Sequence, residues 1–329
     1  MSERTSLRLP PGTPRGTRPV TYLRVSVTER CTFRCLYCSP DGPPSQAAPT
    51  LSARDIERLV RVARRVGITH VRLTGGEPLE RPDIVDMVRR LAGLGLGQVS
   101  LTTNGARLAG LALPLRRAGL DRVNVSLPHI EAEGFRRITG RDALWDVLAG
   151  IRAAQDAGLA PVKTNTVVLR GYNDEAVFDL VEFGRRHGLT VRFIEYMAPE
   201  EDEARQHFVP ASETLARLRQ RLHLREAQDQ VGANGAEGPA RYYRADGRGL
   251  VGFISPLSEP FCATCNRLRL TATGRLRPCL YGEHEVDLLP ALRGRSWERD
   301  LTEAFRLAVS LKARAHAETL PKAMRLIGG

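Results

Sequence analysis

Between residues 22 and 196, short runs rich in β-branched residues alternate with longer amphipathic runs, and this alternation constrains the fold more than any other feature of the sequence. Short apolar or period-two runs are typical of strands, whereas longer runs of period 3.6 are typical of helices. Strands are predicted at residues 22–27, 70–73, 98–102, 122–127, 161–169 and 190–196, and helices at residues 52–66, 81–91, 108–118, 142–157 and 175–187.

About six β-then-α units of this kind predict an α/β fold with a parallel sheet. Strand residues such as 167–169 are too apolar for a sheet with one solvated face, so helices should cover the sheet. A complete or partial β/α barrel fits best, and a doubly wound open sheet is the alternative. In both architectures the chemistry lies at the carboxyl ends of the strands.

Changes in composition divide the chain into three parts. Residues 1–20 are rich in proline, arginine and glycine and are predicted to be a mobile leader. Residues 21–198 form the β/α part. Residues 199–329 form a second region, with an acidic stretch at 200–203, a glycine-rich stretch at 232–238, helices at 212–222 and 297–317, and short strands near 241–243 and 250–254.

The 329-residue chain carries a net charge of +12, which favours an anionic partner such as nucleic acid, an acidic membrane or a phosphorylated small molecule. Arginine accounts for 46 of its 49 basic residues and is scattered, without the basic runs and interleaved aromatics of a nucleic-acid-binding protein. No run approaches the about 20 apolar residues that span a membrane. We therefore expect a cytoplasmic protein that binds neither nucleic acid nor membrane.

The first three of the six cysteines are Cys31, Cys35 and Cys38, in a C-x3-C-x2-C spacing just beyond the first predicted strand. Disulfide frameworks belong to short secreted chains, so metal binding is the better interpretation. A closed structural site uses four ligands, whereas three thiolates leave one position open. An iron–sulfur cluster with one uncapped iron fits this spacing, and a zinc knuckle that borrows a distant histidine is the alternative.

The other three are Cys262, Cys265 and Cys279, in a C-x2-C-x13-C spacing in the second region. They too form a triad without a fourth cysteine. His284 follows Cys279 by five residues and could complete a tetrahedral zinc site, so spacing alone leaves zinc and an iron–sulfur cluster open.

Two sets of basic residues stand out. Lys163 is one of three lysines in the chain and lies on a predicted strand among apolar neighbours. Strand alternation places it on one face with Asn165, toward a barrel interior where an ammonium group suits phosphate oxygens. Arg267 and Arg269 are two residues apart, so in an extended segment they face one ligand together. The alternatives are a lysine that reaches past the sheet rim and a solvated arginine face.

The first triad, together with Gly75 and Gly76 in the segment RLTGGEPL that ends the second strand, resembles the radical S-adenosylmethionine (SAM) enzymes. The second triad, in the segment CATCNRLR, resembles one family among them, the GTP 3′,8-cyclases of molybdenum cofactor biosynthesis. The resemblance spans about residues 22–329. It implies a partial (β/α)6-type TIM barrel, a smaller C-terminal α+β region that closes the barrel, and two [4Fe–4S] clusters, one per triad.

The resemblance also assigns roles to single residues. The residues assigned to GTP are Arg24, Arg72, Thr102, Lys163, Arg267, Leu268 and Arg269. Of these, Arg24, Arg267 and Arg269 are assigned as catalytic contacts to the substrate and the radical intermediate. Those for SAM are Tyr37, Gly76, Ser126 and Met197. A double-glycine C-terminus such as Gly328-Gly329 enters the active site in this family.

The reaction that the resemblance implies is radical cyclisation of GTP between C3′ and C8, initiated by reductive cleavage of SAM. The implied partners are an external electron donor such as a flavodoxin-type reductant, a downstream cyclic pyranopterin monophosphate synthase and, in a homodimer, a second copy of the chain. Two alternatives stay open: a radical SAM enzyme that modifies peptide or RNA with an auxiliary cluster, and a basic zinc protein that binds nucleic acid.

Overall fold

The computed structural model of the chain describes residues 19–38, 49–197, 205–227, 238–281 and 284–312. Its centre is a sheet of six parallel strands in sequence order, as the alternation predicted. The strands are β1 (Tyr22–Ser26), β2 (His70–Thr74), β3 (Gln98–Thr103), β4 (Arg122–Ser126), β5 (Lys163–Val168) and β6 (Thr190–Glu195).

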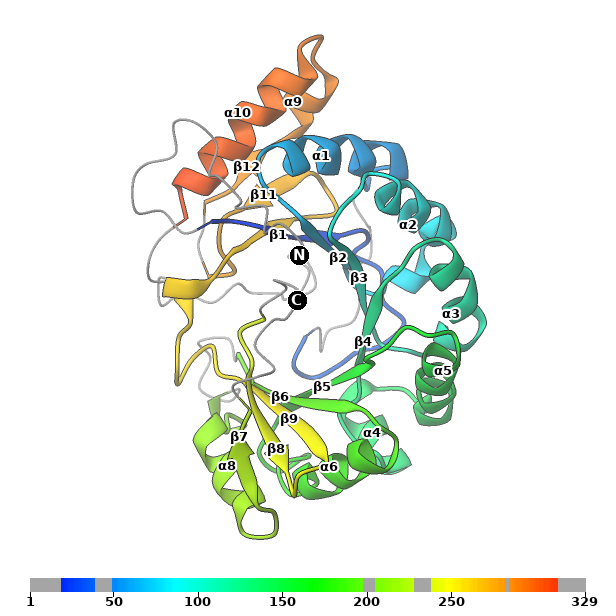
Figure 1. Cartoon of the computed structure of the whole chain (residues 1–329), viewed down its shortest axis with the longest axis vertical. Helices are drawn as coiled ribbons and strands as arrows, with labels where there is room; N and C mark the ends of the chain where they lie inside the picture. The colour runs from blue at the N-terminus through cyan, green and yellow to red at the C-terminus, as the bar shows by residue number, and fades with distance from the viewer. Residues whose placement is uncertain (1–18, 39–48, 198–204, 228–237, 282–283, 313–329) are drawn as a thin grey trace, which may run out of the picture.

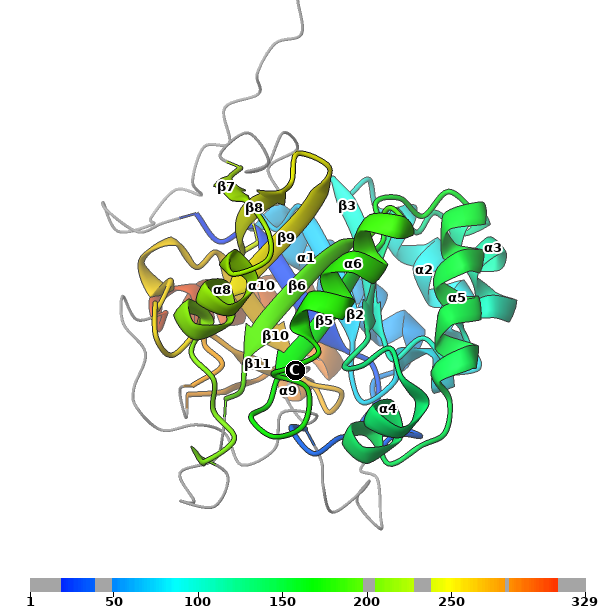
Figure 2. The same cartoon turned by 90° about the horizontal axis from the view of Figure 1, so that it is seen from below.

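The helices of this part follow the strands and lie around the outside of the curved sheet (Figure 1). They are α1 (Ala53–Arg65), η1 (Pro78–Glu80), α2 (Ile84–Ala92), α3 (Leu108–Arg117), α4 (Ala132–Thr139), α5 (Leu144–Asp156) and α6 (Val177–Arg186). The arrangement is a partial β/α barrel, because a doubly wound sheet would carry helices on both faces. Figure 2 shows α3 and α5 side by side against this outer face.

One of these helices, α4, was not predicted from the sequence. It is short and contains Gly134, which lowers helix propensity. The structure explains this glycine, because a Cβ there would lie 2.6 Å from the ring of His129.

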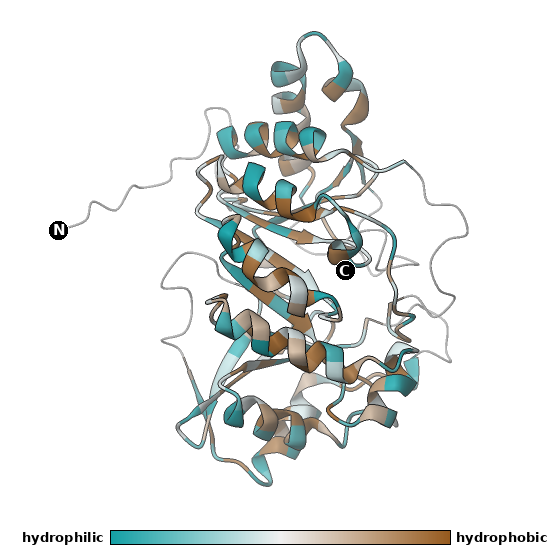
Figure 3. Cartoon of the chain, turned by 90° about the vertical axis from the view of Figure 1, so that its right-hand side faces the viewer, coloured by the Kyte–Doolittle hydropathy of each residue, from teal (hydrophilic) through white to brown (hydrophobic). Residues whose placement is uncertain are grey.

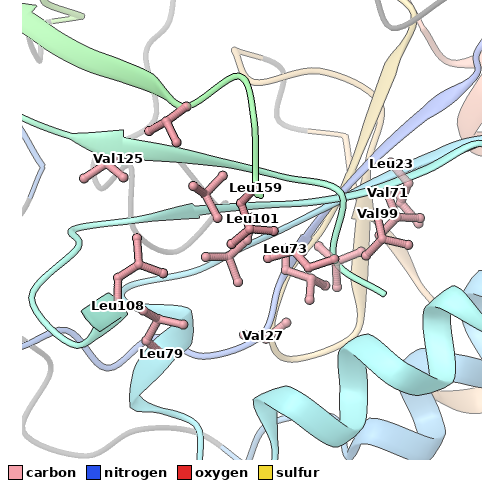
Figure 4. Packing of buried hydrophobic residues seen from close by; sticks show 14 of the residues in the cluster. Leu23, Val27, Val71, Leu73, Leu79, Val99, Leu101, Leu108, Val125 and Leu159 are labelled. Atoms are coloured by element: carbon pink, nitrogen blue, oxygen red, sulfur yellow. The ribbon is translucent and has the colours of Figure 1, made fainter. Parts of the chain in front are cut away.

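The core lies between the sheet and the outer helices, whose apolar sides face the sheet (Figure 3). Residues such as Leu23, Val71, Val99 and Leu101 point outward from neighbouring strands and pack together beneath the helices (Figure 4). At about 1.5–3 kcal/mol for each large side chain, this burial accounts for much of the stability of the barrel. It also leaves the alternate strand residues free to face inward.

The C-terminal region adds strands to both edges of the central sheet. Beyond β6, the sheet continues with β9 (Gly249–Ile254) in parallel and then with β8 (Arg241–Ala245) and β7 (Leu224–Glu226) in antiparallel orientation. Beyond β1, it continues with β10 (Arg267–Leu270) in parallel and then with β11 (Arg275–Arg277) and β12 (Val286–Asp287) in antiparallel orientation. The region therefore extends the partial barrel from both sides, and the twelve described strands form an open sheet.

The remaining elements of this region are α8 (Ala211–Arg219), η3 (Cys262–Thr264), α9 (Leu289–Arg293) and α10 (Trp297–Ser310). No helix in the described ranges is long and apolar enough to cross a membrane. Several predicted features lie outside the described residues: most of the leader, the acidic stretch, most of the glycine-rich stretch, the end of the last predicted helix and the double-glycine terminus.

Candidate active site

The inner face of the curved sheet borders a cavity of about 490 Å³, large enough for a small molecule. Alternate residues of the central strands line it, because the pleat sends successive side chains to opposite faces. These residues are Tyr22, Arg24, Arg72, Thr102, Arg122, Asn124, Ser126, Lys163, Asn165, Val167, Thr190, Arg192 and Ile194. The predicted orientation of Lys163 and Asn165 is confirmed.

The charge of the cavity wall has one sign. Among the described residues that line the cavity, eight are arginine or lysine and none is aspartate or glutamate. The eight are Arg24, Arg72, Arg122, Lys163, Arg192, Arg267, Arg269 and Lys312. Clustered cations within low-dielectric walls attract anions strongly, so the cavity is suited to a ligand with several negative charges.

Three of these cations form a row across neighbouring strands. Arg24 is in register with Arg72 on β2 and with Arg269 on β10. Burial, followed by the charges of Arg269 and Arg72, holds the pKa of Arg24 well below its ordinary value. Burial and the charge of Arg267 lower the pKa of Arg269 to about 10. Bringing these groups together is unfavourable, and a bound polyanion would relieve that repulsion.

A second basic group lies on β5 and β6. Lys163 Nζ donates a hydrogen bond of 3.1 Å to the Tyr242 hydroxyl, and burial lowers the pKa of Lys163. Arg192 lies close to both, and its charge lowers the pKa of Lys163 further. Gly252 permits this packing, because a Cβ there would lie 2.8 Å from the Tyr242 ring and 3.0 Å from the Arg192 side chain.

Among the buried polar atoms that border the cavity and have no hydrogen-bond partner in the described part of the chain, three lie side by side on the sheet. They are Thr102 Oγ1, Asn124 Nδ2 and Asn165 Oδ1, on the neighbouring strands β3, β4 and β5. An unsatisfied buried polar atom costs about 1–3 kcal/mol. A ligand that supplies hydroxyl or amide groups would satisfy them.

The first triad lies on the loop that follows β1, where Cys31, Cys35 and Cys38 are free and partly exposed. The loop is fixed to the end of α4, since the Arg34 N–H donates to the Thr139 carbonyl at 2.9 Å. Burial raises the pKa of the Cys31 thiol to about 11, and burial with the neighbouring thiols raises that of Cys35. Three soft sulfur donors in one loop suit an iron–sulfur cluster.

Gly75 and Gly76 contact the start of this cysteine loop. The Gly76 N–H donates to the Thr28 carbonyl at 2.7 Å, and a Cβ on Gly76 would lie 2.2 Å from the Arg30 carbonyl oxygen. Gly75 has a φ of +147°, and its Cβ would lie 2.5 Å from the Thr28 carbonyl oxygen. The family resemblance assigns Gly76 to SAM; the close approaches that the structure shows for both glycines are to the protein's own backbone.

Glu77, directly after the glycine pair, joins the ends of two strands. Its buried carboxylate accepts hydrogen bonds from the Leu79 N–H, the Thr103 hydroxyl and the Asn104 N–H at 2.9, 2.7 and 2.6 Å. Burial raises the pKa of Glu77 to about 7, although these hydrogen bonds oppose the shift. Asn104 Nδ2 in turn lies 4.0 Å from Cys31 Sγ, which places the carboxyl group behind the first triad.

The second triad borders the cavity itself. Cys262, Cys265 and Cys279 are partly exposed and among the lining residues. Burial raises the pKa of the Cys265 thiol, but the positive charges of Lys312 and Arg267 outweigh burial and lower it below its ordinary value. These cations stabilise a thiolate, which is the form that binds metal.

A zinc site is not assembled around either triad. No three His, Cys, Asp or Glu side chains in the described ranges gather closely enough to hold one metal ion, and His284 is exposed. A [4Fe–4S] cluster does not require three side chains to meet at one metal ion, because each cysteine binds a different iron. The two sets of three free cysteines therefore fit two such clusters.

Other predicted site residues differ in their placement. Tyr37, Ser126 and Met197 line the same cavity as the basic residues. Gly76 packs against the cysteine loop, as described above. Leu268 is fully buried, and its side chain belongs to the core between sheet and helices, so its backbone alone is available to a ligand.

Several residues of the cavity wall were missed from the sequence, among them Arg122, Arg192, Tyr242 and Lys312. Arg192 could have been found by the argument used for Lys163, since it too is a charged residue within an apolar strand. Lys312 is another of the three lysines, and that rarity was a usable signal.

Comparison with known proteins identifies the class first. Residues 25–184 match the family model of the Radical SAM superfamily. The structure resembles Streptococcus suis SuiB bound to S-adenosylmethionine, with a TM-score of 0.61 and 17% identity over 88% of this chain and 66% of that protein. It also resembles anSMEcpe with bound AdoMet, with a TM-score of 0.60 and 15% identity over 94% and 88% of the two chains. The fold is that of the radical SAM superfamily, and the matched residues include the first triad.

The second region defines the family within this class. Residues 189–318 match the family model of Molybdenum Cofactor Synthesis C. The GTP 3′,8-cyclase of Moorella thermoacetica is 46% identical over 321 residues, which are 95% of this chain and 98% of that protein. The GTP 3′,8-cyclase of Marinobacter nauticus is 45% identical over 92% of both chains. This chain belongs to the GTP 3′,8-cyclase family.

Proposed function

We propose that this chain converts GTP to (8S)-3′,8-cyclo-7,8-dihydroguanosine 5′-triphosphate, the first step of molybdenum cofactor biosynthesis, and that the cavity of the partial barrel is where GTP binds. One observation carries the proposed location: the wall presents eight cations and no carboxylate among its described residues, directly beside a cysteine triad. A nucleoside triphosphate supplies the negative charge that this wall lacks.

The cationic residues hold the triphosphate in this proposal. The row of Arg24, Arg72 and Arg269 offers planar guanidinium groups that bind phosphate oxygens in pairs, and Lys163 adds a compact charge from β5. Arg267 and Arg269 leave β10 on the same side and place the substrate next to the second triad. Such fixed contacts hold the bound substrate in the orientation that the reaction requires.

The uncharged part of GTP meets the neutral part of the wall. Thr102, Asn124 and Asn165 present unpartnered atoms of both donor and acceptor type, which suit ribose hydroxyls and the edge of the guanine base. A backbone contact from Leu268 adds to this surface. Each satisfied atom regains the about 1–3 kcal/mol that its burial costs.

The SAM side of the site is assigned to Tyr37, Gly76, Ser126 and Met197, beside the first triad. Bound at Cys31, Cys35 and Cys38, a reduced [4Fe–4S] cluster with SAM supplies the one-electron chemistry that removes a hydrogen atom from the substrate. Cys262, Cys265 and Cys279 hold the second [4Fe–4S] cluster at the GTP side. The chain's own residues keep the two sites apart and keep bulk water away from the substrate between them.

Further properties follow from this assignment. The reaction is that of a lyase, it takes electrons from an external donor such as a flavodoxin-type reductant, and it delivers its product to a cyclic pyranopterin monophosphate synthase. Six free cysteines of this kind belong in a reducing compartment, so we place the enzyme in the cytoplasm. On the family resemblance we further propose a homodimer, and a division into a SAM-binding part at 21–198 and a GTP-binding part at 199–329 behind a mobile leader.

The test is anaerobic incubation of the reconstituted protein with SAM, dithionite and GTP, with ATP in place of GTP as the matched control. We expect 5′-deoxyadenosine and a cyclised nucleotide with GTP, and about eight irons and eight sulfides per chain. Absence of GTP-dependent 5′-deoxyadenosine and of a cyclised nucleotide would refute the proposed reaction. Mass spectrometry of the products shows whether 5′-deoxyadenosine and the cyclised nucleotide are formed.

A further inference from the structure

Lys312 connects the two chain segments that carry the second triad. Its Nζ donates hydrogen bonds to the Arg267 carbonyl at 2.7 Å and to the Pro278 carbonyl at 2.8 Å. Arg267 lies two residues after Cys265, and Pro278 directly precedes Cys279. One ammonium group therefore fixes the backbone next to two of the three cysteines.

The third donor of this ammonium group is directed at sulfur. Lys312 forms a hydrogen bond to the Cys265 sulfur and places its positive charge beside it. An ammonium group has three N–H donors and no acceptor, so two carbonyls and one thiolate use its full capacity. A neutral side chain of the same length would leave both carbonyls and the thiolate without this partner.

The helix that precedes Lys312 is firmly attached to the barrel. Leu301, Phe305 and Ala308 of α10 are fully buried in the core. Arg65 of α1 forms an ion pair of 2.8 Å with Glu298, and the Arg58 guanidinium lies 5.6 Å from the centre of the Trp297 ring. Lys312 therefore extends from a fixed point, and it can hold the two cysteine segments in a defined position.

We propose that Lys312 is a positioning residue for the second iron–sulfur cluster: it sets the separation of the Cys265 and Cys279 segments and places a positive charge beside the Cys265 sulfur. Thiolate-bound clusters are stabilised by such nearby cations and donors. This inference rests on the proposed assignment of the second cluster to Cys262, Cys265 and Cys279.

The experiment uses the full chain with Cys31, Cys35 and Cys38 all changed to serine, so that bound iron reports on the second triad alone. Lys312→Met and Lys312→Arg are compared with Arg152→Met, which also removes a positive charge but from a side chain that is 76% exposed. The measurements are iron and sulfide per chain after anaerobic reconstitution, the rate of iron release to a chelator, and the electron paramagnetic resonance spectrum of the reduced cluster.

We expect Lys312→Met to release iron about tenfold faster or more, which is the range for loss of a supporting contact to a metal ligand. Its spectrum should shift, whereas Arg152→Met should match the parent. Lys312→Arg keeps the charge and several donors and should restore most of the retention. Equal release rates in Lys312→Met and the parent would overturn the proposal.

A second series separates positioning from general stability. Here Lys312→Met is placed in the chain whose second triad is serine, so that iron reports on the first triad. We expect the first triad to load as in its parent, and equal losses at both triads would overturn the proposal. If the parent of the first series binds no iron, the cluster assignment is refuted and this inference fails with it. If that parent binds iron and Lys312→Met retains the iron equally well, only this inference is refuted.

Discussion

The two cysteine triads offer the same three sulfur ligands in opposite electrostatic surroundings. At the first triad, burial and the carboxylate of Glu77 raise the pKa of Cys31. At the second triad, Lys312 and Arg267 lower the pKa of Cys265 against the effect of burial. Ligand number alone therefore does not distinguish the two sites, and the charges around them do.

This difference matches the molecules proposed for each site. SAM carries a sulfonium and an ammonium group, and the acidic side chain of Glu77 lies behind the first triad. GTP carries a triphosphate, and the cationic wall beside the second triad suits such an anion. A single cavity can thus keep two charged ligands at separate places without a physical partition.

The largest expected effect comes from removing one ligand of each triad. Cys35→Ser and Cys265→Ser should each abolish formation of the cyclised nucleotide and each remove about four irons per chain. Only Cys35→Ser should also abolish SAM cleavage in the absence of GTP. Anaerobic iron analysis with quantification of 5′-deoxyadenosine checks both variants, and loss of SAM cleavage in both would contradict the division of labour between the triads.

The next effect concerns the carboxyl group at the first triad. The pKa of Glu77 is raised from 4.5 to about 7, so the native state favours its protonated form. The stability that this group contributes is present below pH 4.5 and is lost as pH rises through 7, a change of about 3 kcal/mol. Glu77→Gln should therefore flatten the dependence of stability on pH in this window.

Urea unfolding at pH 5 and pH 8 measures this change. Glu80→Gln, three residues further along the chain, is the control and should keep the pH dependence of the parent. The same pH dependence in Glu77→Gln as in the parent would show that Glu77 is not the titrating group.

A smaller effect is expected at the cationic wall. Lys163→Ala should weaken GTP binding by about 10- to 100-fold, because a hydrogen bond to a charged group contributes about 1.5–3 kcal/mol. SAM cleavage without GTP should persist, since the first triad is untouched. Anaerobic calorimetry measures the affinity, with Arg152→Ala as the control because that side chain is 76% exposed. Unchanged GTP affinity in Lys163→Ala would refute its assignment.

The smallest effect is expected for the hydroxyl that supports this lysine. Tyr242→Phe removes the 3.1 Å hydrogen bond from Lys163 Nζ but keeps the ring that lies beside the ammonium group. Because this hydrogen bond orients the ammonium group and does not itself bind the substrate, only about 1 kcal/mol should be lost from GTP binding, and the affinity should fall about threefold to tenfold. A loss as large as that of Lys163→Ala would mean that the hydroxyl itself contacts the substrate.

Local periodicity was sufficient to predict the parallel α/β sheet and the side chains that share its inner face, whereas the choice of a partial barrel came from the family resemblance. Lys163 and Asn165 share a face because successive strand residues alternate, and the same rule placed Arg267 and Arg269 together before their strand was known. Cysteine spacing likewise identified both triads. These features depend on residues that are close in the sequence.

The rest of the site depends on contacts between distant segments, which periodicity does not reveal. The row of arginines exists because β10 pairs with β1, although Arg269 and Arg24 lie far apart in the chain. Lys312 reaches the second triad only through the packing of α10 on the barrel. For the same reason Leu268 could not be assigned to the core until its strand was placed.

The strand order has a consequence for the synthesis of the protein. The first strand, β1, acquires one of its two neighbours only when β10 has been made, and β6 likewise waits for β9. Until then the nascent barrel has two bare parallel edges, which are prone to pair with other chains. The first triad leaves the ribosome long before the second, so a half-made chain already presents one set of thiols while both edges are unprotected. Protection of those edges, by chaperones or by rapid completion of the chain, is a requirement that this topology builds into every copy of the enzyme.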